Sequence, residues 1–371
     1  MIARLTKLWN EAGPPRRLAV AGVLALAVLL LPLPLSKFWQ SILIDMLLFA
    51  LLALGLNVVV GFAGLLDLGY VAFYAIGNYV FGIITTGDYA KALFLEGGVN
   101  LPPPPVWETW MWLLIPLGLI AAMVTGVLLG APTLRLRGDY LAIVTLGFGE
   151  IVRIVARNME SVTVGPRGIT PMPHPGIDLG PVEYNFGLDP RGYYYLLLLL
   201  TAIMVAVIVR LNHSRIGRAW AAIREDEVAA ASMGVPTVRM KLWAFAIGAS
   251  TAGVAGVVQA SRVTFVSPEI FTILVSFFIL SMVVIGGMGS IAGSIAGAAI
   301  IVVVPEVVRS AVPQFQEYRF LVFGAVLVVF MIFRPQGLIP SRRRAIELKG
   351  EVREGTVYEV QAAEGGPGGS A

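Results

Sequence analysis

The chain is long and strongly apolar: of its 371 residues, 57% are hydrophobic and only 13% are charged, and its mean hydropathy is +0.82. Soluble domains carry about 25% charged residues, so these few Lys, Arg, Asp and Glu side chains cannot cover the surface of a soluble monomer. The net charge of +4 is small and does not suggest nucleic-acid binding. The composition therefore excludes a soluble protein and indicates that the chain is surrounded by a lipid bilayer.

The sequence also lacks the residue types on which several kinds of site depend. It contains no Cys, which excludes disulfides, thiol nucleophiles and cysteine metal sites. Its two histidines, His174 and His213, lie in different polar loops, so neither a histidine metal site nor a Ser/His/Asp triad is expected. We therefore predict no catalytic residues and no metal in this chain, and a membrane-embedded enzyme is disfavoured.

Ten apolar runs are long enough to be membrane-spanning helices, which need about 20 mostly apolar residues each. They lie near residues 18–35, 40–60, 70–86, 111–131, 140–156, 192–211, 241–262, 272–288, 291–309 and 318–333. The first run follows four basic residues but lacks the small-residue cleavage site of a signal peptide, so we interpret it as an uncleaved span. The pattern predicts an all-α polytopic membrane protein with about ten transmembrane helices.

The Lys and Arg residues predict the orientation of these spans, because cytoplasmic loops carry an excess of positive charge. If ten spans alternate, basic residues on the side of the N-terminus outnumber those on the other side by more than two to one. We therefore expect both termini to be cytoplasmic. The expected domains are a cytoplasmic N-terminal segment (1–17), a transmembrane domain (18–339) with external loops 87–110 and 157–191 and a cytoplasmic loop 212–240, and a disordered cytoplasmic tail (340–371).

Two glycine-rich segments interrupt the apolar runs. In the first, Gly61–Gly69, the glycines can break the helix, and Asp67 can cap a new helix that begins nearby. Residues 58–64 faintly echo residues 283–289, and many transporters are built from repeats whose broken helices meet the substrate. The segments predict interrupted helices around a central translocation path, with candidate residues Gly61, Gly64, Asp67, Gly69, Gly286, Gly287 and Gly289. Simple capping by Asp67 and a chance echo are the alternatives.

Small residues spaced four apart indicate helices that pack closely, since association within lipid depends on close contact. Gly289, Gly293 and Gly297 have this spacing, and so do Gly248 and Gly256 with an alanine between them. We predict intramolecular helix packing for Gly248, Gly256, Gly293 and Gly297, with a pathway lining or a subunit interface as alternatives.

Charged side chains are scarce in the apolar runs, where each is costly. Glu150 and Arg153 lie three residues apart, so they can share a helix face and form an intramembrane ion pair. The other polar groups there stand isolated in the sequence: Asp45, Asn57, Asn78, Glu269 and Glu306. No chain of carboxylates like that of a proton pump is present, which disfavours proton coupling.

The cytoplasmic loop contains an Ala-rich segment that suits contact with a partner. Three acidic residues open the run, Gly234 suits its end and Pro236 prevents its continuation, so we predict a helix of about two to three turns. Its alanine face has little bulk and could lie in a groove of another protein, with acids and Arg224 at the rim. A connector packed on its own chain is the alternative.

This segment resembles the loop by which permeases of ABC importers dock on their ATPase, where a Glu-Ala-Ala pattern is followed by Gly four residues after the last Ala. Ala229, Ala230 and Gly234 match that register, whereas Val228 occupies the place of the carboxylate and Glu227 comes one residue early. The resemblance implies an ATPase-coupling helix formed by Arg224, Glu225, Asp226, Glu227, Ala229, Ala230 and Gly234.

More narrowly, the chain from about residue 40 to 340 resembles the longer, M-type permease subunits of branched-chain amino acid ABC importers. The stretches that carry the resemblance are 61–77, 134–153, 163–169 and 217–256. It implies a bacterial inner-membrane machine with a second permease subunit, two cytoplasmic ATPases that hold ATP and Mg, and an external amino-acid-binding protein. The chain has no Gly-x4-Gly-Lys-Ser/Thr phosphate loop of its own, in agreement with hydrolysis on a partner.

Two other functions stay open at this point. Within the same family, the substrate could be urea, a short amide or another amino acid, because selection in such importers lies largely in the binding protein. A secondary transporter would explain the spans and the glycines but leaves the Ala-rich cytoplasmic helix without a role.

Overall fold

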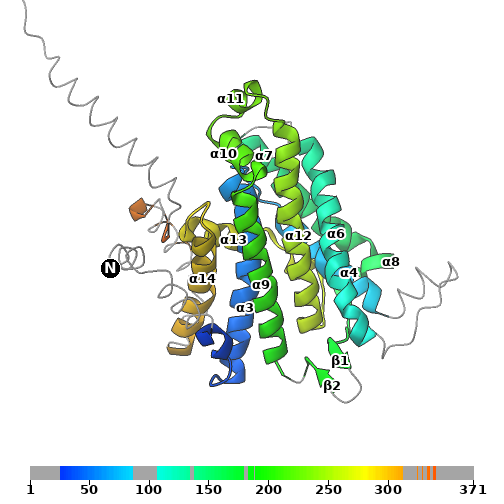
Figure 1. Cartoon of the computed structure of the whole chain (residues 1–371). Coiled ribbons are helices and arrows are strands. Elements are labelled where there is room, and N and C mark those ends of the chain that lie inside the picture. Colours follow the sequence, from blue (N-terminus) through cyan, green and yellow to red (C-terminus); the bar gives the residue numbers. More distant parts are fainter. Residues whose placement is uncertain are drawn as a thin grey trace, which may run out of the picture.

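The computed structural model describes residues 26–86, 107–133, 138–178, 183–187 and 189–311, together with 324, 328, 332–334 and 337–339. Its long helices form a bundle (Figure 1). They are α3 (Lys37–Asn57), continued by the π-helical turn η1 (Val58–Phe62), then α4 (Val71–Thr85), α6 (Trp107–Thr133), α7 (Asp139–Asn158), α9 (Arg191–Asn212), α12 (Thr237–Val263), α13 (Ile273–Gly286) and α14 (Ile291–Ala311). Shorter helices are α8 (Glu160–Thr163), η4 (Gly165–Arg167), α10 (Arg215–Glu225), α11 (Glu227–Ser232) and η5 (Pro268–Ile270).

Each of the eight apolar runs predicted between residues 40 and 309 coincides with one long helix. In the part of the chain that the structure describes, five helices are long and apolar enough to cross a membrane: Lys37–Phe62, Trp112–Thr133, Arg191–Asn212, Thr237–Val263 and Ile291–Ser310. The helices α4 and α13 are apolar but shorter, and α7 is more polar. The protein is thus a multi-pass helical membrane protein.

The number of ten spans and the placement of the termini stay predictions. Residues 18–25 of the first run and most of the last run (318–333) lie outside the described residues, as do the N-terminal segment 1–17, most of the loop 87–110 and the tail from 340.

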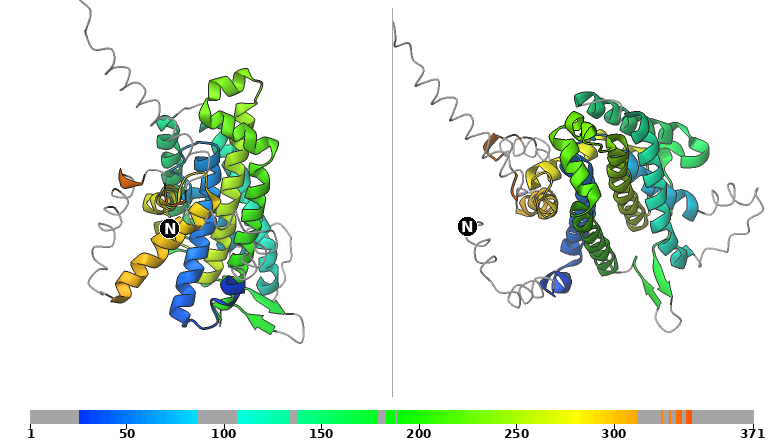
Figure 2. Two further views of the ribbon diagram at one scale, coloured as in Figure 1. Left: turned by 60° about the vertical axis from the view of Figure 1, so that its left-hand side comes forward. Right: turned by 45° about the horizontal axis from the view of Figure 1, so that its top comes forward.

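The all-α expectation needs one correction. Within the loop 157–191, strands β1 (Gly176–Asp178) and β2 (Glu183–Asn185) pair antiparallel, with Ile177 opposite Tyr184. This hairpin lies at the end of the bundle opposite α10 and α11 (Figures 1 and 2). A strand of three residues is too short to show the alternating pattern by which a sequence predicts a strand.

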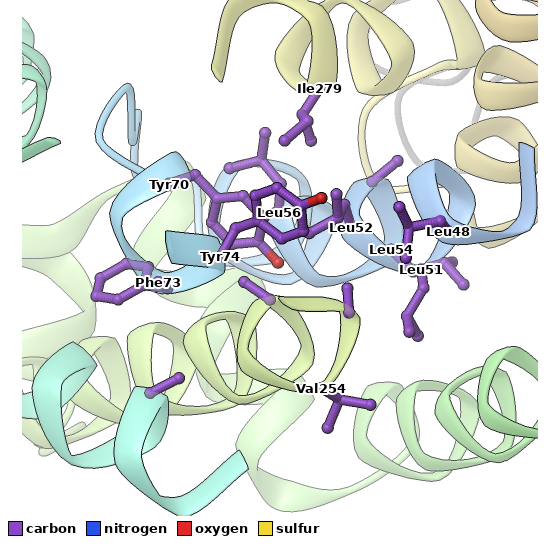
Figure 3. Packing of buried hydrophobic residues seen from close by; sticks show 14 of the residues in the cluster. Leu48, Leu51, Leu52, Leu54, Leu56, Tyr70, Phe73, Tyr74, Val254 and Ile279 are labelled. Atoms are coloured by element: carbon purple, nitrogen blue, oxygen red, sulfur yellow. The ribbon is translucent and has the colours of Figure 1, made fainter. Parts of the chain in front are cut away.

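The helix α12 lies at the centre of the bundle and packs on α6, α4 and α3 (Figure 1). Around it, leucines of α3 meet Tyr70 and Tyr74 at the start of α4, with Ile279 of α13 close by (Figure 3). The helix α3 is apolar on all sides, as expected of a helix that is surrounded by other helices. The core therefore sits between α3, α4, α12 and α13.

Glycine makes the closest of these helix contacts. A Cβ at Gly253 of α12 would overlap the carbonyl of Gly118 in α6, and one at Gly77 of α4 would overlap the carbonyl of Gly253. The predicted packing residues Gly248 and Gly256 lie on the same helix, where a Cβ would meet Val59 or the backbone of α4, respectively. Neighbouring backbones can approach this closely only where side chains are absent.

The helices α13 and α14 form a second tight pair. A Cβ at Gly293 would meet the carbonyl of Gly286, and one at Gly297 would overlap the carbonyl of Met282. Both predicted packing glycines of α14 therefore face α13.

Candidate functional site

The short helices α10 and α11 cover one end of the bundle (Figure 1). Ser214 caps the start of α10, where its hydroxyl accepts hydrogen bonds from the amides of Ile216 (3.1 Å) and Gly217 (3.4 Å). The side chain of Trp220 is buried, and its Nε1 donates to the carbonyl of Met240 at 2.7 Å. The helix α10 is therefore fixed to the beginning of α12.

Both ends of α11 are closed by well-defined caps. The Asp226 carboxylate accepts from the amides of Val228 (2.7 Å) and Ala229 (3.0 Å), as an N-cap residue does. At the other end, Gly234 adopts the left-handed conformation (φ +83°), and the amide of Val235 donates to the carbonyl of Ala230 at 3.1 Å. These contacts form a Schellman motif, which requires a residue with positive φ and so favours glycine.

The observed helix α11 is shorter than the predicted two to three turns and is separated from α10. Glu225 is the last residue of α10, Asp226 is extended, and α11 spans only the six residues Glu227–Ser232. The three acids do not open one helix together, because Asp226 turns its side chain back to cap the amides that follow it. The predicted end at Gly234 agrees with the structure.

One face of α11 is exposed and carries small or apolar side chains. Ala229 is exposed, Val228 is 59% exposed and Met233 is 85% exposed. Ala230 is buried against the chain itself, at 4% exposure. Of the two alanines of the predicted register, only Ala229 is thus available to a partner.

Glu227 turns inward and binds a buried cation. Its Oε1 lies 2.6 Å from Nζ of Lys241, whose side chain is only 4% exposed. A buried ammonium is stable only when it is paired, so this ion pair fixes α11 to α12. Glu227 and Lys241 can pair because the beginning of α12 packs against α11.

Arg224 links α10 to the first glycine-rich segment. Its Nη1 donates to the carbonyl of Gly61 at 2.7 Å, across 163 residues of sequence. Gly64 has a positive φ of +71°, and a Cβ placed there would lie 2.9 Å from Cγ of Arg224. The backbone of this segment therefore accommodates the arginine closely.

The two glycine-rich segments meet each other at Asn57. Its Oδ1 accepts from the amide of Gly289 at 2.8 Å, and its Nδ2 donates to the carbonyl of Ser290 at 3.3 Å. A Cβ on Gly61 would approach the amide of Gly289 closely, and Gly287 and Gly289 both have positive φ. We call this contact between residues 57–64 and 286–290 the glycine junction.

The remaining candidates of the first segment, Asp67 and Gly69, lie against α7. Asp67 is 2% exposed and accepts from the amide of Gly69 at 2.9 Å, while the amide of Leu68 donates to Thr145 Oγ1 at 3.1 Å. Asp67 therefore closes a turn before α4 and is not its N-cap, which is Tyr70. A Cβ at Gly69 would overlap the Thr145 carbonyl.

The acids and amides that stand isolated in the sequence have partners in the fold, which corrects that expectation. Arg153 forms an ion pair with Glu150, and its Nη1 also binds Glu269 at 3.1 Å. Asp45 pairs with Arg262 of α12. Asn78 donates to the carbonyl of Tyr74 at 2.9 Å, and Glu306 lies 3.1 Å from Arg309. For Asn57, sequence reasoning noted the residue but missed its contact, since its partners are more than 200 residues away.

No cluster of His, Cys, Asp and Glu that could hold a metal ion occurs among the described residues. Two short helices are thus held to the bundle: α10 by the buried indole of Trp220 and by Arg224, which reaches the glycine junction, and the exposed α11 by the ion pair of Glu227.

Comparison with known proteins identifies relatives over most of the chain. The family model described as the permease component of branched-chain amino acid transport systems matches residues 39–331. The high-affinity branched-chain amino acid transport system permease protein LivM of Escherichia coli is 41% identical over 358 residues, which cover 92% of this chain and 79% of that protein.

More distant relatives share the same description. The permease protein LivH of Salmonella typhimurium is 27% identical over 78% of this chain and 91% of its own length. A probable branched-chain amino acid permease protein LivM of Methanocaldococcus jannaschii is 25% identical over 80% of this chain and 91% of its own length. No solved structure matches the chain significantly.

Proposed function

Because this chain belongs to the family of permease components of branched-chain amino acid transport systems, we propose that it is a permease subunit of an ATP-driven importer for leucine, isoleucine and valine. It forms part of the translocation path in the bacterial inner membrane and is a transport subunit without enzymatic activity of its own. The names of the relatives support the substrate class, and the geometry of α10 and α11 supports the coupling to ATP.

The exposed face of α11 is the observation that carries the coupling. A helix of only six residues is too short to be stable alone, yet this one is capped at both ends and fixed through Glu227 to a buried lysine. It presents Val228, Ala229 and Met233 to the outside. Such a rigid, small and apolar surface suits the groove of a cytoplasmic ATPase.

The other partners complete the importer. Two ATPase subunits hold ATP and Mg, a second homologous permease faces this one across the path, and an external binding protein delivers the amino acid. The resemblance between this chain and both LivM and LivH supports a pair of related permeases.

The charge of the two long polar segments supports the orientation. Six Lys and Arg residues lie between 210 and 241, around α10 and α11, whereas three lie between 157 and 191 at the hairpin end. Since cytoplasmic loops are enriched in basic residues, we place α10 and α11 in the cytoplasm.

In the mechanism, closure of the ATPases moves α11 and α10 as one unit. Arg224 passes this displacement to the carbonyl of Gly61, and the glycine junction passes it on to α13 and α14 through Asn57. Positive-φ glycines let the backbone turn there without steric strain. A direct role of Gly61, Gly64, Asp67, Gly69, Gly286, Gly287 and Gly289 in binding the substrate remains a prediction.

The test is to block the exposed face of α11. In the complete importer, Ala229→Trp should abolish co-purification of the ATPase and amino-acid uptake, because the indole fills the space that the partner needs. The matched control is Ala131→Trp, an exposed alanine in the last turn of α6, which should keep both. Normal ATPase binding by folded Ala229→Trp would show that α11 is not the coupling helix.

A further inference from the structure

A cavity of about 470 Å³ lies between α3, α13 and α14, away from the glycine junction. This volume is within the range of small-molecule sites, roughly 300–1,000 Å³. On α3 the cavity is lined by residues 38–49, in the first half of the helix, whereas the junction lies at the helix's end. One continuous helix therefore carries the cavity near one end and meets α10 at the other (Figure 1).

The charged groups of the cavity balance one another. Asp45 and Glu306 supply two carboxylates, and Arg309 supplies a guanidinium. Asp45 is also paired with Arg262, which lies outside the lining, so each of the two carboxylates has one guanidinium partner. A site with both signs and no net charge suits a ligand that itself carries one positive and one negative group.

Glu306 presents an oxygen that can accept a further hydrogen bond. Its Oε2 lies 3.1 Å from Nε of Arg309, but in the described part of the chain this buried oxygen has no partner with hydrogen-bond geometry. A buried carboxylate oxygen left in this state costs free energy unless a donor reaches it. An ammonium group provides such donors.

The rest of the lining is apolar. Its aliphatic side chains are Ile42, Leu274, Val275, Met282, Ile301, Val302 and Pro305, and its aromatic side chains are Phe38, Phe49 and Phe278. The only hydroxyls are those of Ser41 and Thr272. Such a lining fits an aliphatic side chain, and once the charged groups bind the ligand's ammonium and carboxylate it offers few of the hydrogen bonds that a buried polar side chain needs.

We propose that this cavity binds an aliphatic amino acid as a zwitterion, with its ammonium group toward Glu306 and Asp45 and its carboxylate toward Arg309. The inference rests on the proposed function and gives the translocation path one defined binding site. That site lies at the end of the bundle opposite α11, where an external binding protein would release its ligand.

The first test uses the absence of native cysteine, since any single Cys variant then reacts at one position only. Ser41→Cys places a thiol in the cavity, and Ser36→Cys, at the exposed start of the same helix, is the control. In the complete importer, leucine at about ten times its dissociation constant should slow maleimide labelling of Ser41→Cys roughly tenfold. Labelling of Ser36→Cys should not change.

The same experiment distinguishes other occupants. Glycerophosphoethanolamine, a zwitterion without an aliphatic side chain, represents the headgroup of a membrane lipid; protection by it and not by leucine would overturn the proposal. Ser41→Cys could also react in the isolated chain but fail to react in the importer, with or without leucine. That result would show that the second permease fills the cavity, and it would overturn the proposal.

The second test fills the cavity. Val302→Trp introduces an indole into the lining, whereas Val304→Trp on the same helix points to the exterior, where Val304 is 50% exposed. Val302→Trp should lower leucine uptake at least tenfold while ATP hydrolysis and subunit assembly persist, and Val304→Trp should transport normally. Parental uptake by Val302→Trp would contradict the cavity assignment alone, whereas an unmodified importer that takes up no branched-chain amino acid would contradict the proposed function.

Discussion

At the scale of single residues, Arg224 connects α10 directly to the glycine junction. Its hydrogen bond to the carbonyl of Gly61 joins two segments that the sequence places 163 residues apart. A charged hydrogen bond contributes about 1.5–3 kcal/mol, enough to bias the position of a short helix without holding it permanently. The residue therefore suits a contact that transmits motion.

We expect Arg224→Ala to uncouple the importer. The ATPase should still bind, because Ala229 and the caps of α11 are intact, but uptake per ATP hydrolysed should fall roughly tenfold or more, as loss of that hydrogen bond implies. Uptake and hydrolysis measured together in proteoliposomes give this ratio. Arg218→Ala is the control on the same helix, since among the described residues Arg218 donates to the nearby carbonyl of His213, at 3.2 Å, and not to the junction. Equal ratios in the two variants would contradict the role of Arg224.

Glu227 has a structural role that differs from the capping by Asp226, because it pairs with the buried Lys241. Removing it leaves Lys241 buried without a partner, for which the cost in buried sites is about 3–5 kcal/mol; here we expect less, since Glu227 is 27% exposed. Glu227→Ala should therefore lower the melting temperature of the detergent-solubilised protein. The double variant Glu227→Ala/Lys241→Met should recover most of the loss, and a double variant as unstable as the single one would exclude the ion pair as the cause.

At the scale of elements, α12 depends on glycine for its place in the bundle. A Cβ at Gly253 would overlap the backbone of α6 and the side chain of Ala122, so a larger residue forces the two helices apart. Gly253→Leu should lower the free energy of unfolding by at least about 1–3 kcal/mol, which is the usual cost of overpacking a tight core. Expression yield and thermal melting in detergent measure the effect.

The control for this prediction is Gly147→Leu. Gly147 lies in the helix α7, and a Cβ there would meet nothing within 4 Å. It should be tolerated, and similar losses of stability in both variants would show that glycine is required for a reason other than the α12 contacts.

The sequence predicted these elements better than their contacts. Apolar runs of sufficient length located every described long helix between residues 40 and 309. An apolar segment in lipid forms a helix because its backbone N–H and C=O groups must hydrogen-bond to one another. Four-residue spacing predicts close packing at Gly248, Gly256, Gly293 and Gly297, but it does not single out Gly77 or Gly118, whose closeness to Gly253 depends on how separate helices cross. No local pattern contains that information.

The candidate site was predictable to the same extent. The end of α11 at Gly234 follows from its chemistry, but an acid such as Asp226 can either lie within the first turn of a helix or cap it, and only the fold decides. The partners of Asn57, Lys241 and Asp45 are set by the tertiary structure. The segment that we propose as the ATPase contact could therefore be singled out from the sequence, whereas the contact of Arg224 with the glycine junction could not.

At the scale of the whole molecule, the proposed orientation gives its two ends different environments. Cys variants of Ser232, exposed on α11, and of Ser36, exposed at the start of α3, should label from opposite sides of the membrane. In right-side-out vesicles, an impermeant maleimide should modify Ser36→Cys and spare Ser232→Cys until the membrane is opened. The reverse pattern would place α11 outside the cell and remove the ATPase from reach.

The ion pair between Asp45 and Arg262 also has a consequence for the time course of synthesis. The two residues are separated by 217 positions, so at about 5–20 residues per second the ribosome makes the arginine roughly 10–40 s after the acid. During that interval α3 has left the ribosome with a carboxylate that has no counter-ion from α12. The insertion machinery must therefore shelter this carboxylate until the second half of the chain arrives.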